Sequence, residues 1–178
     1  FDKFLSNIPV IAQRIQNRYE GLLYPREGFM ANNPNAGRPF DPEVGPVNQA
    51  SSDVLIPAFL AAYTGTDAKK IYLTPFPSLR HILPNWRVTY DGLLRVAGLD
   101  RWFKNITLNH AYQCTYTVGS YSSYLNWIGV NGTLGFNQDE LTQQPVPSSP
   151  YNISSVAITE RFAPLIGFQF TLKNDLKF

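Results

Sequence analysis

The sequence predicts a mainly β protein whose antiparallel strands form part of a large transmembrane β-barrel, with short helices and long loops in the N-terminal half. Three observations indicate this fold class. Apolar and polar residues alternate with period two over long stretches of the C-terminal half. Glycine, proline and asparagine repeatedly interrupt the N-terminal half. The longest apolar run, residues 56–63, is far shorter than the roughly 20 residues of a bilayer-spanning helix, whereas a spanning strand needs only about 9 to 11.

Composition narrows the functional classes. Lysine and arginine (15) nearly balance aspartate and glutamate (13), and no block of like charge occurs. This pattern lacks the basic patch of a nucleic-acid binder, so we expect no nucleic-acid partner. The single cysteine, Cys114, excludes an intramolecular disulfide and a zinc site of the CxxC type. Because the chain opens with Phe1 and shows no signal-peptide pattern, we expect it to be a segment of a longer protein.

The first expected element is a short amphipathic helix within residues 1–24. Its apolar residues recur at spacings of three and four, at Ile8, Ile11, Ile15 and Tyr19. Ser6 or Asn7 is the expected N-cap, and Pro9 then falls in the first turn. Gly21 is the expected end of this helix.

A long loop and a second short helix complete the segment 1–84, which we expect to be an irregular insertion, plug or cap. Residues 25–52 contain several turn pairs of asparagine, glycine and proline and show no sustained period. Residues 54–63 are expected to form a helix, with Pro57 tolerated in its first turn and Gly65 at its end.

Residues 85–178 are expected to hold antiparallel transmembrane strands, at about 85–97, 102–118 and 153–174. Soluble strands usually have about five or six residues, yet the alternation runs unbroken over 106–118 and over 156–172. This length favours strands tilted across a membrane. Gly98 suits a short turn, whereas residues 119–152 form a long loop, so we expect the turn on the periplasmic side and the loop outside.

The two faces of these strands predict two environments. The expected lipid-facing residues are Val156, Ile158, Phe168, Phe170, Leu172, Ile106 and Leu108. The expected lumen-facing residues are Thr107, Asn109, Gln113, Thr115, Gln169 and Thr171, which are typical of a water-filled interior. Glu160 stands on the apolar face, so we expect it at a membrane interface or against another strand.

A sheet packed on one face produces the same alternation. The alternative is therefore a soluble all-β module on the cell surface that binds a carbohydrate or a protein. Strand length and dependence on detergent discriminate the two.

Several segments together carry a family resemblance. In chain order they are DVLIPAFLAAY (53–63), LPNWRVTYDGL (83–93), YTVGSY (116–121), LNW (125–127), VPSSPY (146–151), ISSV (153–156), FAPLIG (162–167) and TLKN (171–174). These segments resemble the SprA family, also called Sov, the giant outer-membrane translocon barrels of the type IX secretion system in Bacteroidetes. The resemblance runs in uninterrupted order from about Val47 to Asn174 and is weaker over residues 1–50. Asn152 departs from the aspartate that is more frequent at this position in the family.

The resemblance implies a segment of a protein-conducting channel in the bacterial outer membrane, which exports folded cargo and supports secretion and gliding motility. The implied partners are the remainder of the same barrel chain, secreted cargo with a C-terminal sorting domain, a PorV-type barrel, a periplasmic plug protein and membrane lipid. It implies no catalytic residue, cofactor or metal, so we expect transport rather than enzymatic activity.

Overall fold

The computed structural model describes residues 1–76, 84–95 and 98–174, and its chain divides into two compact units. The first unit comprises Phe1–Ser78 and Val118–Val156, and the second comprises Leu79–Thr117 and Ala157–Phe178. This division differs from the predicted boundary at residue 84, because residues 119–152 fold with the N-terminal half of the chain. None of the helices in the described ranges is long and apolar enough to cross a bilayer.

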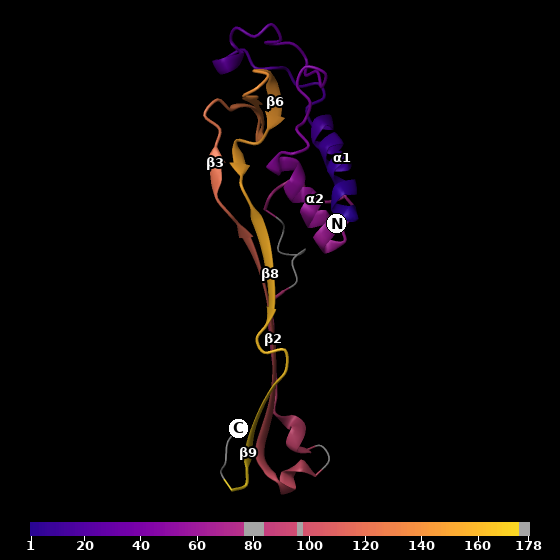
Figure 1. The fold of residues 1–178 in the computed structure, drawn as a ribbon, viewed down its shortest axis with the longest axis vertical. Coiled ribbons are helices and arrows are strands. Elements are labelled where there is room, and N and C mark those ends of the chain that lie inside the picture. The colour runs from indigo at the N-terminus through magenta and orange to yellow at the C-terminus, as the bar shows by residue number, and fades with distance from the viewer. Residues whose placement is uncertain (77–83, 96–97, 175–178) are drawn as a thin grey trace. The chain divides into compact units, whose positions relative to one another are not determined.

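Two α-helices, α1 (Asp2–Asn17) and α2 (Ser52–Thr64), lie side by side in the first unit (Figure 1). Both bury apolar side chains, which are Ile11, Ala12 and Ile15 from α1 and Val54, Ile56, Ala58, Leu60 and Ala61 from α2. The predicted second helix is therefore confirmed. Gly65 ends α2 with φ of 70°, a left-handed conformation that glycine adopts without a Cβ penalty.

The predicted ends of the first helix are wrong. Phe1, rather than Ser6 or Asn7, is the N-cap, and α1 ends at Asn17, before Gly21. Asn7 is buried inside α1, where its Nδ2 donates a hydrogen bond to the Ala58 carbonyl of α2 at 3.2 Å. This contact between helices satisfies a buried amide, which local sequence signals could not reveal.

Proline positions within the helices also differ from expectation. Pro9 and Pro57 both lie inside their helices rather than in the first turn. An irregular loop is expected at 25–52, and the structure has one at 18–51, because α1 ends earlier and α2 begins at Ser52. Its regular elements are the 3-10 turn η1 (Gly28–Met30) and an isolated bridge between Leu23 and Pro39.

The predicted long loop at 119–152 is a folded region, which corrects the prediction. It contains five strands: β3 (Tyr121–Ser123), β4 (Ile128–Asn131), β5 (Leu134–Gln138), β6 (Pro145–Ser148) and β7 (Tyr151–Ile153). β3 pairs with β7, and β4, β5 and β6 form a three-stranded antiparallel sheet. Strands of three to five residues are too short to show a period. Pro145 and Pro147 are tolerated because β6 is an edge strand.

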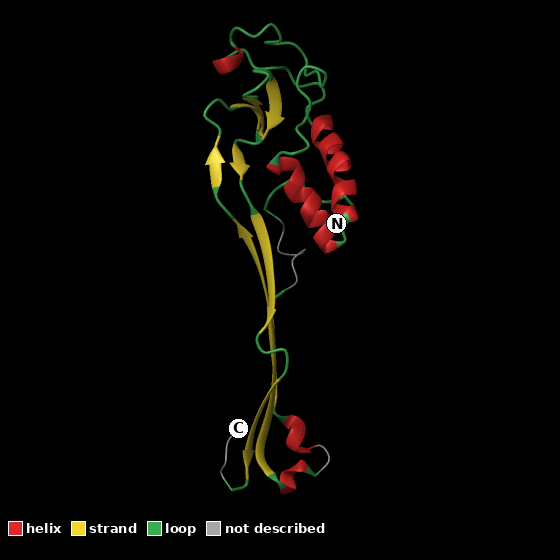
Figure 2. Ribbon diagram, in the orientation of Figure 1, coloured by secondary structure: helices red, strands yellow, loops and turns green. Residues whose placement is uncertain are grey.

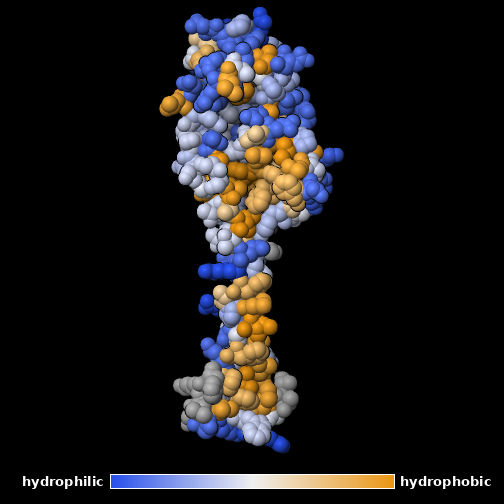
Figure 3. All heavy atoms as spheres, in the orientation of Figure 1, coloured by the Kyte–Doolittle hydropathy of each residue, from blue (hydrophilic) through white to orange (hydrophobic). Residues whose placement is uncertain are grey.

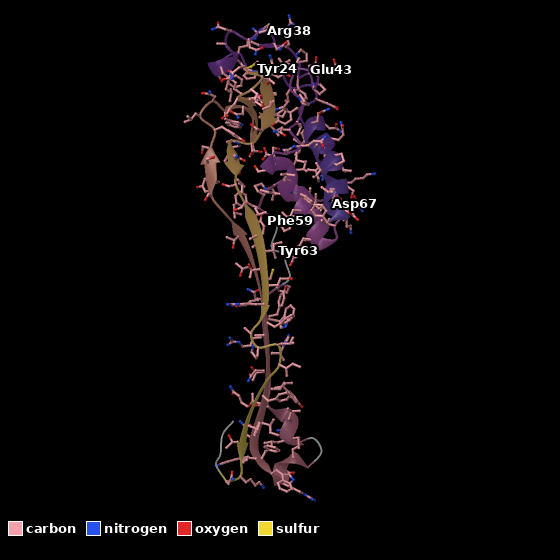
Figure 4. The ribbon with its side chains drawn as sticks, viewed as in Figure 1. Tyr24, Arg38, Glu43, Phe59, Tyr63 and Asp67 are labelled. Carbon is pink, nitrogen blue, oxygen red and sulfur yellow. The ribbon has the colours of Figure 1, made fainter. Side chains whose placement is uncertain are left out.

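An aromatic core holds the first unit together. Phe136 of β5 is fully buried, and its ring lies 5.3 Å from Tyr19, 5.0 Å from Tyr24 and 6.0 Å from Phe40. The Tyr19 hydroxyl donates to the Gly135 carbonyl at 2.9 Å, and burial raises the pKa of Tyr19 to about 12. Figure 4 shows Tyr24 in the loop between α1 and α2. The loop after α1 and the strand β5, which are far apart in the sequence, therefore contribute to the same aromatic core.

The second unit is built on β2 (Phe103–Val118), which confirms the predicted strand at 102–118. β1 (Trp86–Tyr90) pairs with one edge of β2, and β8 (Val156–Phe162) and β9 (Gly167–Leu172) pair with β2 as well (Figure 2). The pairings of β2 with β1 and with β9 are antiparallel. The mainly β, antiparallel character of the predicted fold class is therefore confirmed.

Two of the predicted strands are shorter than expected. The strand expected at 85–97 ends at Tyr90, and residues 92–95 form a 3-10 turn; residues 96–97 lie outside the described residues. At Gly92, which begins this turn, a Cβ would meet the hydroxyl of Tyr90 at 2.6 Å. The strand expected at 153–174 is divided by a turn at 163–166, where Pro164 cannot donate to a ladder.

Candidate functional site

The strands of the second unit sort their side chains onto two faces. Across β2 and β9, the apolar pairs are Ile106 with Phe170 and Leu108 with Phe168, and the polar pairs are Thr107 with Gln169 and Asn105 with Thr171. Opposite partners in an antiparallel pair project from the same side of the sheet. The even and odd residues that we assigned to different environments therefore lie on opposite faces of one sheet.

β1 extends both faces. Trp86, Val88 and Tyr90 lie opposite Tyr112, His110 and Leu108, and so join the apolar face. On the polar face, the Thr89 hydroxyl donates to Asn109 Oδ1 at 3.1 Å. The two faces are thus continuous from β1 through β2 to β9.

A bulge in β2 brings Phe103 to the apolar face, although the sequence pattern assigns this residue to the polar face. The register shifts between Phe103 and Asn105, so that Phe103 pairs with Leu172. The Phe103 ring packs edge-on against Phe170 at 5.4 Å. Strict alternation from Ile106 assigns Phe103 to the polar face, and a bulge of this kind has no clear signal in a single sequence.

Glu160 of β8 finds its partner on β2. The Tyr112 hydroxyl donates to Glu160 Oε1 at 2.5 Å, whereas Arg161 Nε donates to Gln113 Oε1 at 2.7 Å on the polar face. The expectation that Glu160 lies against another strand is therefore confirmed. Because Val156 and Ile158 alternate with the same period as Glu160, they belong to the apolar face.

An aromatic cluster occupies the middle of the apolar face. Trp86 stacks on Tyr112 with ring centroids 4.3 Å apart, and Phe162 lies 5.4 Å from Tyr112 and 5.7 Å from His110. The His110 Nδ1 also contacts the Leu165 carbonyl. The sequence places His110 on an apolar face, but the cluster depends on strand register, which the sequence leaves open.

The apolar face is exposed in part: Ile106, Tyr112 and Cys114 of β2 are buried within this chain, whereas residues of the neighbouring strands are exposed. Val88 is 52% exposed and Phe168 is 59% exposed, and Trp86, Tyr90 and Phe162 are also exposed. In Figure 3, hydrophobic residues gather along one side of the β2 ladder and hydrophilic residues along the other. A contiguous apolar surface of this kind marks contact with a membrane or with other protein.

Backbone edges of the sheet are also open. β1 pairs with β2 as far as Tyr112, and beyond it Asn85 Oδ1 accepts a hydrogen bond from the Cys114 N–H at 2.6 Å. Among the described residues, no further strand pairs with the outer edges of β1, β8 or β9. Edges of this type accept additional strands.

The described residues hold no group of three or more side chains arranged to bind a metal ion. A comparison of the chain with protein-family models finds no match, and neither does a comparison with curated proteins.

Proposed function

We propose that the chain is part of the wall of a protein-conducting β-barrel in the bacterial outer membrane, a translocon of the type IX secretion system. The observation that carries this proposal is the separation of an apolar face, exposed in part over β1, β8 and β9, from a polar face along strands as long as β2. A membrane barrel requires this separation, because its exterior contacts hydrocarbon and its interior contacts water.

The dimensions of β2 support a membrane-spanning role. Its 16 residues extend about 53 Å at roughly 3.3 Å per residue. A strand tilted by about 45° needs about 9 to 11 residues to cross the hydrocarbon layer. β2 is therefore long enough to cross it and to continue into the interface.

The chemistry of each face supports the proposed orientation. Phe168, Phe170 and Leu108 would contact lipid, and Thr107 and Gln169 would face the lumen. Polar side chains on the lumen side bond to one another across strands, as Thr89 does with Asn109 and Arg161 with Gln113. Such pairs reduce the cost of lining a water-filled passage with a sheet face.

The open edges of β1 and β9 would pair with further strands of the same barrel chain, since a closed barrel satisfies every backbone group. The similarity to the SprA family in residues 47–174 supports the remaining parts of the proposal. Folded cargo with a C-terminal sorting domain would pass through the channel, and a PorV-type barrel and a periplasmic plug would gate it. This wall segment would guide cargo and catalyse no reaction.

Detergent dependence tests the proposal against a soluble cell-surface binding module. We expect the 178-residue chain to aggregate in plain buffer and to become monodisperse in detergent, as measured by light scattering after size exclusion. A folded, monodisperse monomer in plain buffer would contradict the barrel and favour the binding module.

The orientation has a separate test in cells that carry the full-length parent protein. Cysteine is introduced at Gln138 or at Asp100, with Cys114 replaced by serine, and a membrane-impermeant thiol reagent is added to intact cells. We expect Gln138→Cys to be labelled and Asp100→Cys to be protected. The reverse result would invert the orientation and leave the barrel unaffected.

A further inference from the structure

A second candidate surface lies in the first unit, beside β3. A pocket of about 420 Å³ is lined by Phe76, Val118, Tyr121, Tyr151 and Ile153. The Tyr151 ring lies 6.5 Å from Phe76 and 6.4 Å from Tyr121, with both pairs in edge-on contact. The lining residues that the structure describes are aromatic or aliphatic, and their side chains carry no formal charge at neutral pH. Its volume falls within the range of ordinary ligand pockets.

The pocket has a buried floor and exposed walls. Ile153 is 6% exposed and lies opposite Tyr121 in the pairing of β3 with β7. Tyr121 is 71% exposed and Phe76 is 57% exposed. Two large rings thus stand in solvent around an apolar floor, an arrangement suited to an apolar group that enters from outside.

The adjacent strand β3 uses one of its edges. Hydrogen bonds from Tyr124 N–H to Pro150 O and from Ser154 N–H to Ser120 O continue the pairing toward β7. Among the described residues, no strand pairs with the other edge of β3. In an antiparallel pair, alternate residues direct their N–H and C=O groups away from the partner. Because Ser120 and Tyr124 bond toward β7, Ser122 also faces β7, and the backbone N–H and C=O groups of Tyr121 and Ser123 are directed to the open edge.

We propose that this edge and pocket together bind an extended peptide, which adds a third strand beside β3 and inserts one apolar side chain into the pocket, against Tyr121 and Ile153. Every second side chain of an added strand projects toward the face that carries Tyr121, so backbone pairing and pocket filling occur together. Peptides bind other proteins by this mode, in which main-chain bonds supply affinity and pockets supply specificity.

The two features together select a peptide over other ligands. A lipid tail fills an apolar pocket but has no N–H or C=O groups to pair with the edge of β3. A sugar lacks the regular spacing of backbone groups along a strand. Because the lining carries no charge, the inserted side chain is aromatic or aliphatic. This inference goes beyond the proposed channel and does not depend on it.

The test uses the full 178-residue chain, in the buffer or detergent in which it is monodisperse, with fluorescein-labelled heptapeptides as probes. The peptides have the pattern Thr-Val-Thr-X-Thr-Val-Thr, where X is phenylalanine, leucine or isoleucine, and both ends are blocked. We expect saturable binding by fluorescence anisotropy. Tyr121→Ala should weaken it by about tenfold, through loss of an aromatic contact. Tyr121→Phe, which keeps the ring, should bind as the unmodified chain does.

Two matched controls locate the site. Leu125→Ala removes a fully exposed side chain from the turn after β3 and should leave binding unchanged. Two sets of peptides carry N-methyl groups on alternate amides. Methylation of the peptide edge that pairs with β3 should abolish binding, whereas methylation of the opposite peptide edge should change the affinity little.

Several results would overturn the inference. They are the absence of saturable binding for all three peptides, equal binding by Tyr121→Ala, and equal sensitivity of both peptide edges to methylation. Self-association of the chain that Tyr121→Ala abolishes, without peptide binding, would identify a second copy as the occupant and also overturn it. The detergent experiment can fail without changing any of these outcomes, so the two proposals are tested separately.

Discussion

The two units of this protein differ in how they cover their aromatic side chains. In the first unit, Phe136 is fully buried and Tyr19 is 1% exposed at the centre of a closed aromatic core, although Tyr121 and Phe76 are exposed at its surface. In the second unit, Phe168 and Val88 are more than half exposed on a single sheet layer. A stable domain normally packs at least two layers around one core. The first unit therefore has an aromatic core of its own, whereas the second unit has a single sheet layer whose apolar face is partly exposed.

The strongest test of this comparison removes the centre of the closed core. Phe136→Ala leaves a cavity among Tyr19, Tyr24 and Phe40, and we expect it to lower the free energy of unfolding of the first unit by about 3–5 kcal/mol. Denaturant unfolding followed by aromatic circular dichroism measures the change. Leu125→Ala is the matched control, because Leu125 is fully exposed and buries no apolar area. A loss below about 1 kcal/mol would show that the aromatic rings repack without Phe136.

The next test concerns the apolar face of the second unit. Phe168→Arg should cost about 2–4 kcal/mol if residue 168 lies near the bilayer midplane, because the cation would face hydrocarbon. Gln169→Arg, on the opposite face of the same strand, should be nearly neutral. The readout is the amount of heat-modifiable barrel in outer membranes of cells that carry the full-length parent. Equal tolerance of the two substitutions would mean that protein, rather than lipid, covers this face.

A smaller effect is expected at the hydroxyl of Tyr19. Tyr19→Phe removes hydrogen bonds to the Gly135 and Ser148 carbonyls and should lower stability by about 1–2 kcal/mol at neutral pH. Because burial raises the pKa of Tyr19 from 10.0 to about 12, its contribution is complete below pH 10 and is lost as pH rises toward 12. Unfolding free energies measured between pH 9 and pH 12 should therefore fall less steeply in Tyr19→Phe. Parallel pH profiles would contradict this assignment.

The smallest effect is local to the turn after β5. The backbone N–H of Thr142, its hydroxyl and the Leu141 N–H all donate to Asp139, and these bonds hold the pKa of Asp139 below its usual 3.8. The carboxylate stabilises the turn at higher pH, and this contribution is lost as pH falls through the lowered pKa. The amide resonance of Thr142 should titrate below pH 3.8. A midpoint at or above 3.8, or no change in Asp139→Ala, would contradict the role of this carboxylate.

Some of the fold follows from local pattern. The alternation from Ile106 to Val118 determines β2 and its two faces, because side chains on a strand project alternately whatever lies beside it. The apolar run before Gly65 determines α2 in the same way. The loop at 25–52 follows from its turn residues. Each of these features depends on neighbours in the sequence.

Tertiary contacts decide the rest, because they join residues that no local pattern relates. Asn7 lies inside α1 because it meets the carbonyl of Ala58, and strands within 119–152 form around Phe136, which Tyr19 and Tyr24 cover from the other half of the chain. Strand register likewise depends on pairing across long separations. It brings the Tyr112 hydroxyl to Glu160 and places Phe103 on the apolar face through a bulge. The sequence by itself therefore determined which residues share a strand face, and only the tertiary structure decided which faces are covered.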